Sequence, residues 1–228
     1  MSQVAALTRT NLKTPKAAAI AGIVFSILLI AIVWLLRTSV PADPLEPGAW
    51  LATDVQTAAL ALNLVPFAGV AFLWFIGVLR DRLGALEDRF FATVFFGSAL
   101  LFLAMLFVSA AVIGSIILVA SFARPEELIN SITFRFARAT AYVIMNVYAI
   151  KMAGVFMIST STVVIYTGIA PRWIAVLGYA LALIILVGSY YMSWSIIVLP
   201  LWVLLMSLYI LIDNFRQQSA RNPSMADY

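Results

Sequence analysis

The feature that most constrains this chain is the length of its uncharged apolar runs. From Trp173 to Ile212 no residue is charged, whereas a helix of about 20 residues already crosses the hydrocarbon core of a bilayer. Of the whole chain, 64% is hydrophobic and only 11% is charged, which lies well outside the composition of soluble globular domains. The sequence therefore predicts a protein embedded in lipid.

Six such runs follow one another, and each should be helical because lipid offers no partner to an unpaired backbone group. The stretch Trp173 to Ile212 is long enough for two crossings, with a turn in the polar and aromatic segment "SYYMSW", Ser189 to Trp194. The third run exceeds what a bilayer needs, so it should tilt or project beyond it. We predict an all-α polytopic membrane helix bundle (residues 17–212) with six transmembrane helices, at about 17–36, 55–79, 90–122, 140–165, 173–188 and 195–212.

The distribution of lysine and arginine predicts the orientation of this bundle. With tail 1–16 in the cytoplasm, nine basic residues lie inside and only Arg37, Arg124, Arg135 and Arg138 lie outside, in agreement with the positive-inside rule. Six crossings then return tail 213–228 to the cytoplasm, as expected for a protein of the cytoplasmic (inner) membrane. The basic residues are dispersed between apolar segments, so we expect no nucleic-acid partner.

The outer segment Ala123 to Ala139 mixes apolar residues with charged ones. Such a pattern is typical of an interfacial helix. A helical extension of the fourth span explains the same pattern equally well.

Cysteine and histidine are both absent from the chain. Their absence excludes disulfides, thiolate or imidazole metal ligands, and Ser-His or Cys-His catalysis. All ten acidic residues lie in loops, tails or span ends, so a buried acid–base pair is missing as well. We therefore expect no catalytic residue, no metal site and no cofactor, and we expect a protein that is not an enzyme.

Small residues recur at four-residue spacing within several spans. Such seams let helices approach closely in lipid. Packing within the chain is the simpler interpretation, and a membrane-protein partner or a homo-oligomer is the alternative, in addition to the lipid bilayer itself. The seams are Ala18, Gly22 and Ser26 in the first span, Ala110 and Gly114 in the third, and Ala149 and Ala153 in the fourth.

One charged residue, Lys151, lies inside the apolar run "YVIMNVYAIKMAGVFMIS". An ionised lysine at the centre of a span costs about 2.5 to 3.5 kcal/mol on insertion scales, and it usually faces protein or water. If the span begins near Val147, the lysine instead reaches the outer headgroups. If the span is centred on Lys151, the side chain requires a cavity or a lowered pKa.

Helical geometry indicates which residues would share a cavity with Lys151. At roughly 100° per residue, Tyr148 and Thr162 lie on its side of the helix, whereas Tyr142 and Asn146 lie on the opposite side. Asn63, on the second span, adds a further polar group. We predict a ligand site formed by Lys151, Tyr148, Thr162 and Asn63, although a role of Asn63 in bridging helices explains that residue equally well. We expect Lys151→Met to weaken binding of an anionic ligand or acidic partner while leaving stability unchanged or improved.

Two prolines and one glycine carry structural predictions. Pro66 leaves the carbonyl of Leu62 without its usual donor, so it either adds to a polar lining or only kinks the second span. Pro200 should bend or loosen the sixth helix for the same reason. Gly84 should permit the chain reversal after the second span.

Four stretches after residue 70 resemble an uncharacterised family of bacterial multispanning membrane proteins. The resemblance implies a bacterial origin and a six-helix organisation, but it brings no activity, ligand or site residue. The stretches are "FLWFIGVLRDRLG" from Phe72, "EDRFFATVFFGSALLF" from Glu87, "MISTSTVVIYTGIAPRWIAVLGYALALIIL" from Met157 and "LPLWVLLMSLYILI" from Leu199.

The segment "GVLRDRLG", Gly77 to Gly84, is similar to the loop motif between the second and third helices of major facilitator transporters. Ala85 and Leu86 replace the basic pair that usually closes that motif, and six spans make only half of such a transporter. A short charged turn that holds the cytoplasmic side explains the segment equally well.

These observations favour two classes of function. The first is non-catalytic binding or transport of a small solute or lipid, which a charged residue in a cavity would serve. The second is an accessory or scaffolding subunit of a larger membrane complex, which short loops and small-residue seams favour.

Overall fold

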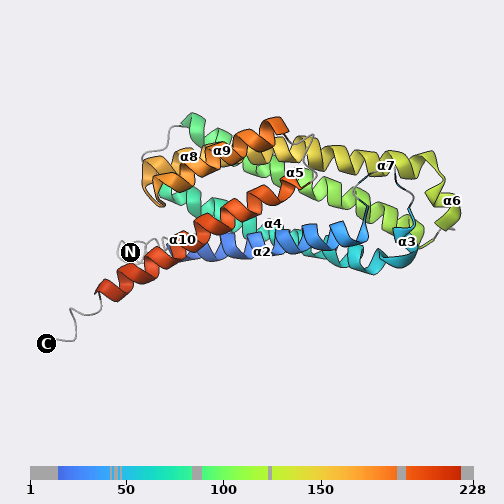
Figure 1. The fold of residues 1–228 in the computed structure, drawn as a ribbon, viewed down its shortest axis with the longest axis horizontal. Coiled ribbons are helices and arrows are strands. Elements are labelled where there is room, and N and C mark those ends of the chain that lie inside the picture. The colour runs from blue at the N-terminus through green and yellow to red at the C-terminus, as the bar shows by residue number, and fades with distance from the viewer. Residues whose placement is uncertain are drawn as a thin grey trace, which may run out of the picture.

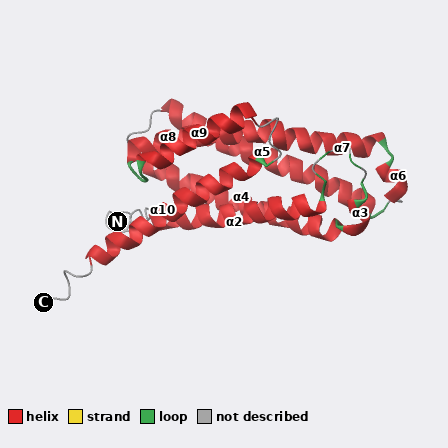
Figure 2. Cartoon of the chain, viewed as in Figure 1, coloured by secondary structure: helices red, strands yellow, loops and turns green. Residues whose placement is uncertain are grey.

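The computed structural model describes residues 15–41, 43, 46, 48–83, 89–122, 125–188 and 194–221. Within these ranges every regular element is a helix (Figures 1 and 2). The longest helices are α2 (Pro15–Ser39), α4 (Val55–Leu83), α5 (Arg89–Ala120) and α10 (Val198–Arg221). The shorter elements are α3 (Trp50–Thr53), α6 (Pro125–Ile129), α7 (Ile132–Val143), η2 (Ile144–Ala149), α8 (Ile150–Thr167), α9 (Arg172–Gly188) and η3 (Ser195–Ile197).

The predicted all-α class is thus confirmed. Among the described residues, five helical segments are long and apolar enough to cross a membrane: Ala17–Ser39, Val55–Arg80, Thr93–Ala120, Ile132–Thr167 and Ser195–Arg216. The remaining apolar helix, α9, is shorter, with a length of about 25 Å. Separate helices α9 and α10 occupy the uncharged stretch after Trp173. The turn residues 189–193, like Gly84, lie outside the described residues.

The helices form two layers (Figure 1). One layer contains α2 and α4, with α10 packed against α2, and the other contains α5, α9 and the continuous helix α7–η2–α8. The start of α2 and the end of α10 lie at the same end of the bundle. Segment 132–139 belongs to the same helical run as the fourth predicted span, so the helical extension describes it and the fourth helix begins earlier than expected.

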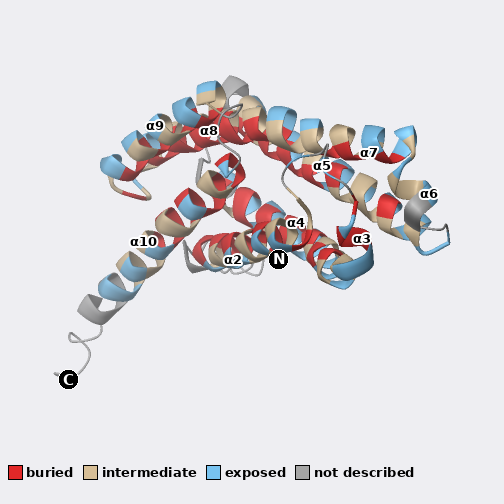
Figure 3. Ribbon diagram, turned by 45° about the vertical axis from the view of Figure 1, so that its right-hand side comes forward, coloured by how far each residue is buried: buried red, intermediate tan, exposed pale blue. Residues whose placement is uncertain are grey.

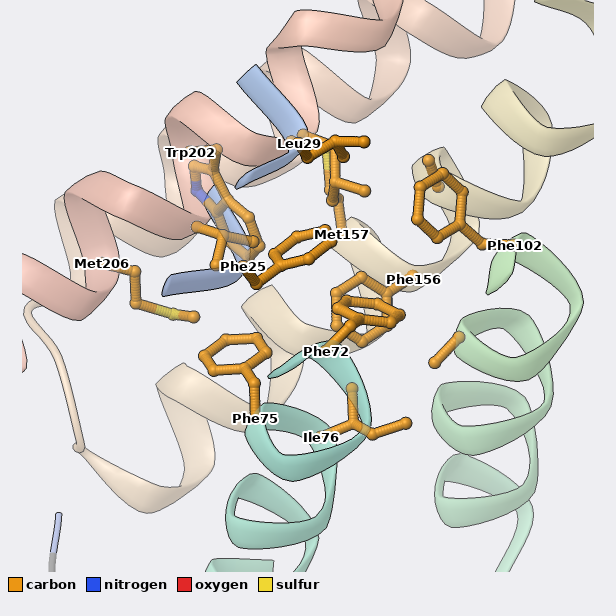
Figure 4. Close-up of a cluster of buried hydrophobic side chains, with 14 of the residues drawn as sticks. Phe25, Leu29, Phe72, Phe75, Ile76, Phe102, Phe156, Met157, Trp202 and Met206 are labelled. Atoms are coloured by element: carbon orange, nitrogen blue, oxygen red, sulfur yellow. The ribbon is translucent and has the colours of Figure 1, made fainter. Parts of the chain in front are cut away.

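An aromatic cluster fills the space between the layers in the half of the bundle that contains α9 and α10. Phe72 of α4 lies at its centre, with ring centroids 4.6 Å from Phe25 on α2, 5.6 Å from Phe102 on α5 and 5.2 Å from Phe156 on α8 (Figure 4). Buried residues line the facing sides of the helices, whereas the outer sides are exposed (Figure 3). We call this cluster the membrane core.

A second, smaller cluster lies at the other end of the bundle, beyond α9 and α10. It contains five buried apolar residues: Trp50, Leu51, Ala58, Ile116 and Phe134. The side chain of Ser131 begins α7 by accepting a hydrogen bond from the Phe134 backbone N–H, 3.1 Å away. We call this part, made of α3, α6, α7, the described loop residues 40, 41, 43, 46, 48 and 49, and the adjoining ends of α4 and α5, the distal region.

The seam in the first span packs within the chain. Ala18, Gly22 and Ser26 are all buried. A Cβ atom at Gly22 would lie 2.9 Å from the Phe75 ring on α4 and would also collide with Ser207 on α10. The absence of a side chain at Gly22 therefore lets three helices meet.

The two prolines differ in position. Pro66 lies inside α4 on its exposed side. Pro200 lies in the first turn of α10, directly after the 3₁₀ turn η3. A missing N–H costs little at a helix start, and the predicted bend at Pro200 stays a prediction.

Candidate functional site

A cavity of about 160 Å³ lies between the two layers, where the membrane core meets the distal region. It is comparable in size to an engineered apolar cavity of about 150 Å³ that accepts benzene. Its walls are mostly aliphatic, with polar groups at one end. The lining residues are Leu29, Ile32, Val33, Leu36, Arg37, Val40, Pro41, Leu62, Val65, Leu106, Ser109, Ala110, Ile113, Arg138, Ala141, Tyr142, Met145, Asn146 and Ile196.

One wall of this cavity contains the π-helical segment η2. Met145 and Asn146 of η2 line the cavity together with Tyr142, one turn earlier. A π-helical turn disturbs the regular bonding of the backbone, and Ser109 of α5 donates to the Ala141 carbonyl across a distance of 3.0 Å. Such segments are rare and frequently accompany functional sites.

Arg138 lines the cavity at the end that lies toward the distal region. Its side chain is only 4% exposed, and its guanidinium donates to three backbone carbonyls of the preceding loop. The acceptors are Pro41 at 2.9 Å, Asp43 at 3.1 Å and Glu46 at 3.0 Å. Because a guanidinium offers several donors in one plane, a single side chain of α7 binds three described residues of this loop.

Arg37, near the end of α2, supplies a second guanidinium at the same end of the cavity. Its central carbon lies 5.4 Å from the ring centre of Trp194. Trp194 is half exposed and directly precedes η3. Tryptophan and arginine are common anchors at the boundary between hydrocarbon and headgroups. This end of the cavity therefore lies near Trp194, at the start of the segment that leads through η3 into α10.

Lys151 lies outside the cavity, and its Nζ donates to the carbonyl of Leu186. Leu186 belongs to the last turn of α9, where carbonyls lack partners within the helix and where a positive charge is favourable. Gly154 allows this approach, because a Cβ atom there would lie 2.7 Å from the Leu186 side chain. The lysine therefore meets the end of a neighbouring helix.

The other predicted site residues lie apart from one another. Thr162 contacts the Tyr179 hydroxyl at 2.7 Å and, like Lys151, faces α9, but about three helical turns away. Tyr148 is 57% exposed. Asn63 is exposed and donates to the Ala59 carbonyl of its own helix at 2.9 Å. The structure does not bring the four predicted residues together, and none of them is among the residues that line the cavity.

The residues that do line the cavity were visible in the sequence in another role. In the sequence, Arg37 and Arg138 are two of the predicted outer basic residues, and Tyr142 and Asn146 lie on the helix face opposite Lys151. That opposite face carries two hydrogen-bonding side chains in an apolar run, which is a sequence signal for the cavity that the prediction did not use. The π-helical segment has no comparable signature in the sequence.

The lining of the cavity combines polar and apolar groups. Its described lining contains guanidinium, hydroxyl and amide groups together with aliphatic side chains, and it contains no carboxylate. Among the described residues no group of three or more acidic side chains is placed to hold a metal ion. A search of protein-family models finds no match to this chain, and neither the curated proteins nor the solved structures that were compared with it are similar to it.

Proposed function

We propose that this chain is a six-span protein of a bacterial cytoplasmic membrane with both termini in the cytoplasm. The proposal is supported by five helical segments of sufficient length, by the apolar α9, and by the common end at which α2 begins and α10 finishes. It also agrees with the excess of lysine and arginine on the inner side.

Because the chain has no cysteine, single cysteines test this topology directly. In intact cells a membrane-impermeant maleimide should label Ala49→Cys and Trp194→Cys, but not Arg172→Cys or Arg216→Cys until the membrane is opened. All four positions are exposed in the structure. Labelling of Arg216→Cys in intact cells would overturn the even number of crossings.

We further propose that the protein binds a small apolar or amphiphilic molecule without catalysis. The observation that carries this proposal is the cavity between the layers, which has aliphatic walls and two guanidinium groups at one end. A cavity of this size between packed helices loses dispersion contacts, and a bound apolar group would restore them. Transport, as opposed to binding alone, would require the same site to open to each side of the membrane in turn.

Filling the cavity tests the binding proposal. Ala110 lines it, whereas the neighbouring Ala111 is exposed on the outside of α5. Native mass spectrometry of gently extracted protein should detect a co-purified small molecule in the wild type and in Ala111→Phe, but not in Ala110→Phe. Equal recovery from Ala110→Phe and Ala111→Phe would contradict the proposal.

The alternative role, a subunit of a larger membrane complex, is favoured by one observation in the distal region. Large apolar side chains are strongly exposed there: Phe122 at 86%, Ile132 at 79% and Phe136 at 71%. A photo-crosslinking residue at Phe136 should then capture a protein at a fixed stoichiometry. Val187, which is 73% exposed on α9, is the matched control position, and capture at both positions alike would contradict the subunit role.

A further inference from the structure

The walls of the cavity differ in polarity. On α2 the lining runs from Leu29 to Arg37, a rise of about 12 Å along the helix. At the Leu29 end the wall is completed by Val65 and Leu106, which are buried and aliphatic. At the other end, Tyr142 of α7 lies near Arg37. A molecule that matched the whole cavity would therefore have an apolar chain and a polar head.

Both arginines of the lining are already engaged within the protein. Arg138 donates to three loop carbonyls, and the carboxyl groups of Asp43 and Glu46 lie near it. Arg37 stacks against Trp194 and makes a further interaction. The described lining contains no carboxylate. A ligand would therefore find its polar partners among the uncharged groups of the lining.

Two uncharged side chains of the lining, Tyr142 and Asn146, offer hydrogen bonds to a ligand. The third uncharged polar residue, Ser109, already donates to the Ala141 carbonyl. The Asn146 Nδ2 donates to the backbone carbonyl of Tyr142 at 3.0 Å, which leaves the side-chain oxygen Oδ1 as an acceptor. Among the described residues, the Tyr142 hydroxyl has no hydrogen-bond partner. One wall thus offers a donor and an acceptor about one helical turn apart.

These two side chains lie at the open side of the cavity. α2 packs on α4 and α10, and η2 packs on α5, but α2 and η2 have almost no contact with each other among the described residues. The lining residues Leu36, Tyr142 and Asn146 are only partly buried there. Both sides of the opening belong to segments apolar enough to cross a membrane. In a bilayer, a molecule dissolved in the lipid would enter between α2 and η2.

We propose that the cavity binds an uncharged aliphatic alcohol, whose chain lies along α2, α4 and α5 and whose hydroxyl group lies between Tyr142 and Asn146. A hydroxyl group both donates and accepts, so it accepts from the Tyr142 hydroxyl and donates to the Asn146 Oδ1. A carboxylate only accepts, and its charge would lose its hydration. This inference rests on the proposed binding function and names its ligand class. A volume of about 160 Å³ accommodates roughly six carbons, by comparison with the cavity that accepts benzene.

Three probes of this size test the hydrogen bonds and the charge separately. Hexan-1-ol and 1-methoxypentane are isomers, but the ether cannot donate a hydrogen bond. Hexanoate carries a charge at neutral pH. The protein is reconstituted in nanodiscs of zwitterionic lipid, and thermal unfolding is followed as each probe is added. Ala110→Phe, or Ile113→Phe if the first variant does not fold, fills the cavity and measures the effect of each probe on the bilayer alone.

The wild type should bind hexan-1-ol with an apparent affinity about fivefold higher than that of the ether, as expected for one additional neutral hydrogen bond. Hexanoate should bind more weakly than either isomer. Asn146→Leu should abolish the preference for the alcohol. Asn63→Leu is the matched control, because Asn63 also donates to a carbonyl of its own helix, at 2.9 Å, but is exposed and does not line the cavity.

The Tyr142 hydroxyl donates to the oxygen of either isomer. Tyr142→Phe should therefore weaken the binding of hexan-1-ol and of the ether alike, by about fivefold. Tyr148→Phe is the matched control, since Tyr148 is exposed on η2 and does not line the cavity.

The outcomes separate the two proposals. Equal affinity of the wild type for hexan-1-ol and its isomer, or tighter binding of hexanoate, would overturn the alcohol as ligand while leaving the binding function intact. Equal losses from Asn146→Leu and Asn63→Leu would overturn the assigned hydroxyl site. Stabilisation by none of the three probes beyond that seen for the filled cavity would overturn the binding function itself.

Discussion

The membrane core and the distal region are held together by different means. In the membrane core, Phe72 contacts aromatic rings from three other helices, and Gly22 lets α2, α4 and α10 meet. In the distal region the apolar cluster is small, and Arg138 ties a loop to α7 through backbone carbonyls. Lipid is as apolar as the surface of a membrane helix, so close packing must stabilise the membrane core. In the distal region, polar contacts supplement a small apolar core.

This comparison predicts that a bulky side chain in the membrane core lowers the free energy of unfolding more than any other change considered below. Gly22→Leu should cost more than about 3 kcal/mol, because the new side chain would collide with Phe75 and Ser207 on two other helices. The yield of monodisperse protein in size-exclusion chromatography measures the effect. Gly77→Leu is the control, since no atom outside its own helix lies within 4 Å of a Cβ atom there, and equal losses from both variants would contradict the packing argument.

Loss of a polar contact should act on the distal region alone. Arg138→Gln removes a guanidinium that holds three carbonyls and should cost about 2 to 3 kcal/mol locally. Hydrogen exchange should accelerate in residues 48–58 while α8 and α10 keep the protection of the wild type. Arg135→Gln, on the exposed side of α7, should change neither. Uniform acceleration over the chain would show that the two regions unfold together.

A smaller effect is expected where Lys151 meets the end of α9. Lys151→Met should accelerate amide exchange in the last turn of α9, Ile185 to Gly188, by a factor that corresponds to about 0.3 to 1 kcal/mol. Lys151→Arg, which keeps the charge, should retain most of the protection. This contact replaces the expectation, drawn from sequence alone, that Lys151→Met leaves stability unchanged or improved. Unaltered exchange in that turn would restore it.

A similarly small effect should come from the hydroxyl contact between α8 and α9. Thr162→Val removes its bond to Tyr179 at nearly constant volume and should lower the free energy of unfolding by about 0.6 kcal/mol, the average for bonds between helices in membranes. A double-mutant cycle with Tyr179→Phe measures the coupling in detergent. A coupling well above 1 kcal/mol would mean that polar contacts also support the membrane core.

The sequence predicts the helices better than the site, for physical reasons. Apolar runs must become helices in lipid, so the start of α9 near Trp173 and of α4 at Val55 was readable. The partner of Lys151 is a backbone carbonyl, and every residue carries one. The partners of Arg138 lie more than ninety positions earlier in the chain and are backbone carbonyls too. Their residue types therefore give no sign in the sequence that they bind Arg138.

The π-helical segment η2 sets the rotational phase between α7 and α8. An α-helix turns by roughly 100° per residue, so one residue inserted or deleted on either side of η2 would turn Arg138 away from its loop or Phe156 away from the aromatic cluster. Within η2, in contrast, a one-residue deletion changes the winding of the π-helical turn itself. The π-helical segment thus determines how α7 and α8 are rotated relative to each other about the common helix axis. It lets one continuous helix direct Arg138 toward the loop carbonyls in the distal region and Phe156 toward Phe72 in the membrane core.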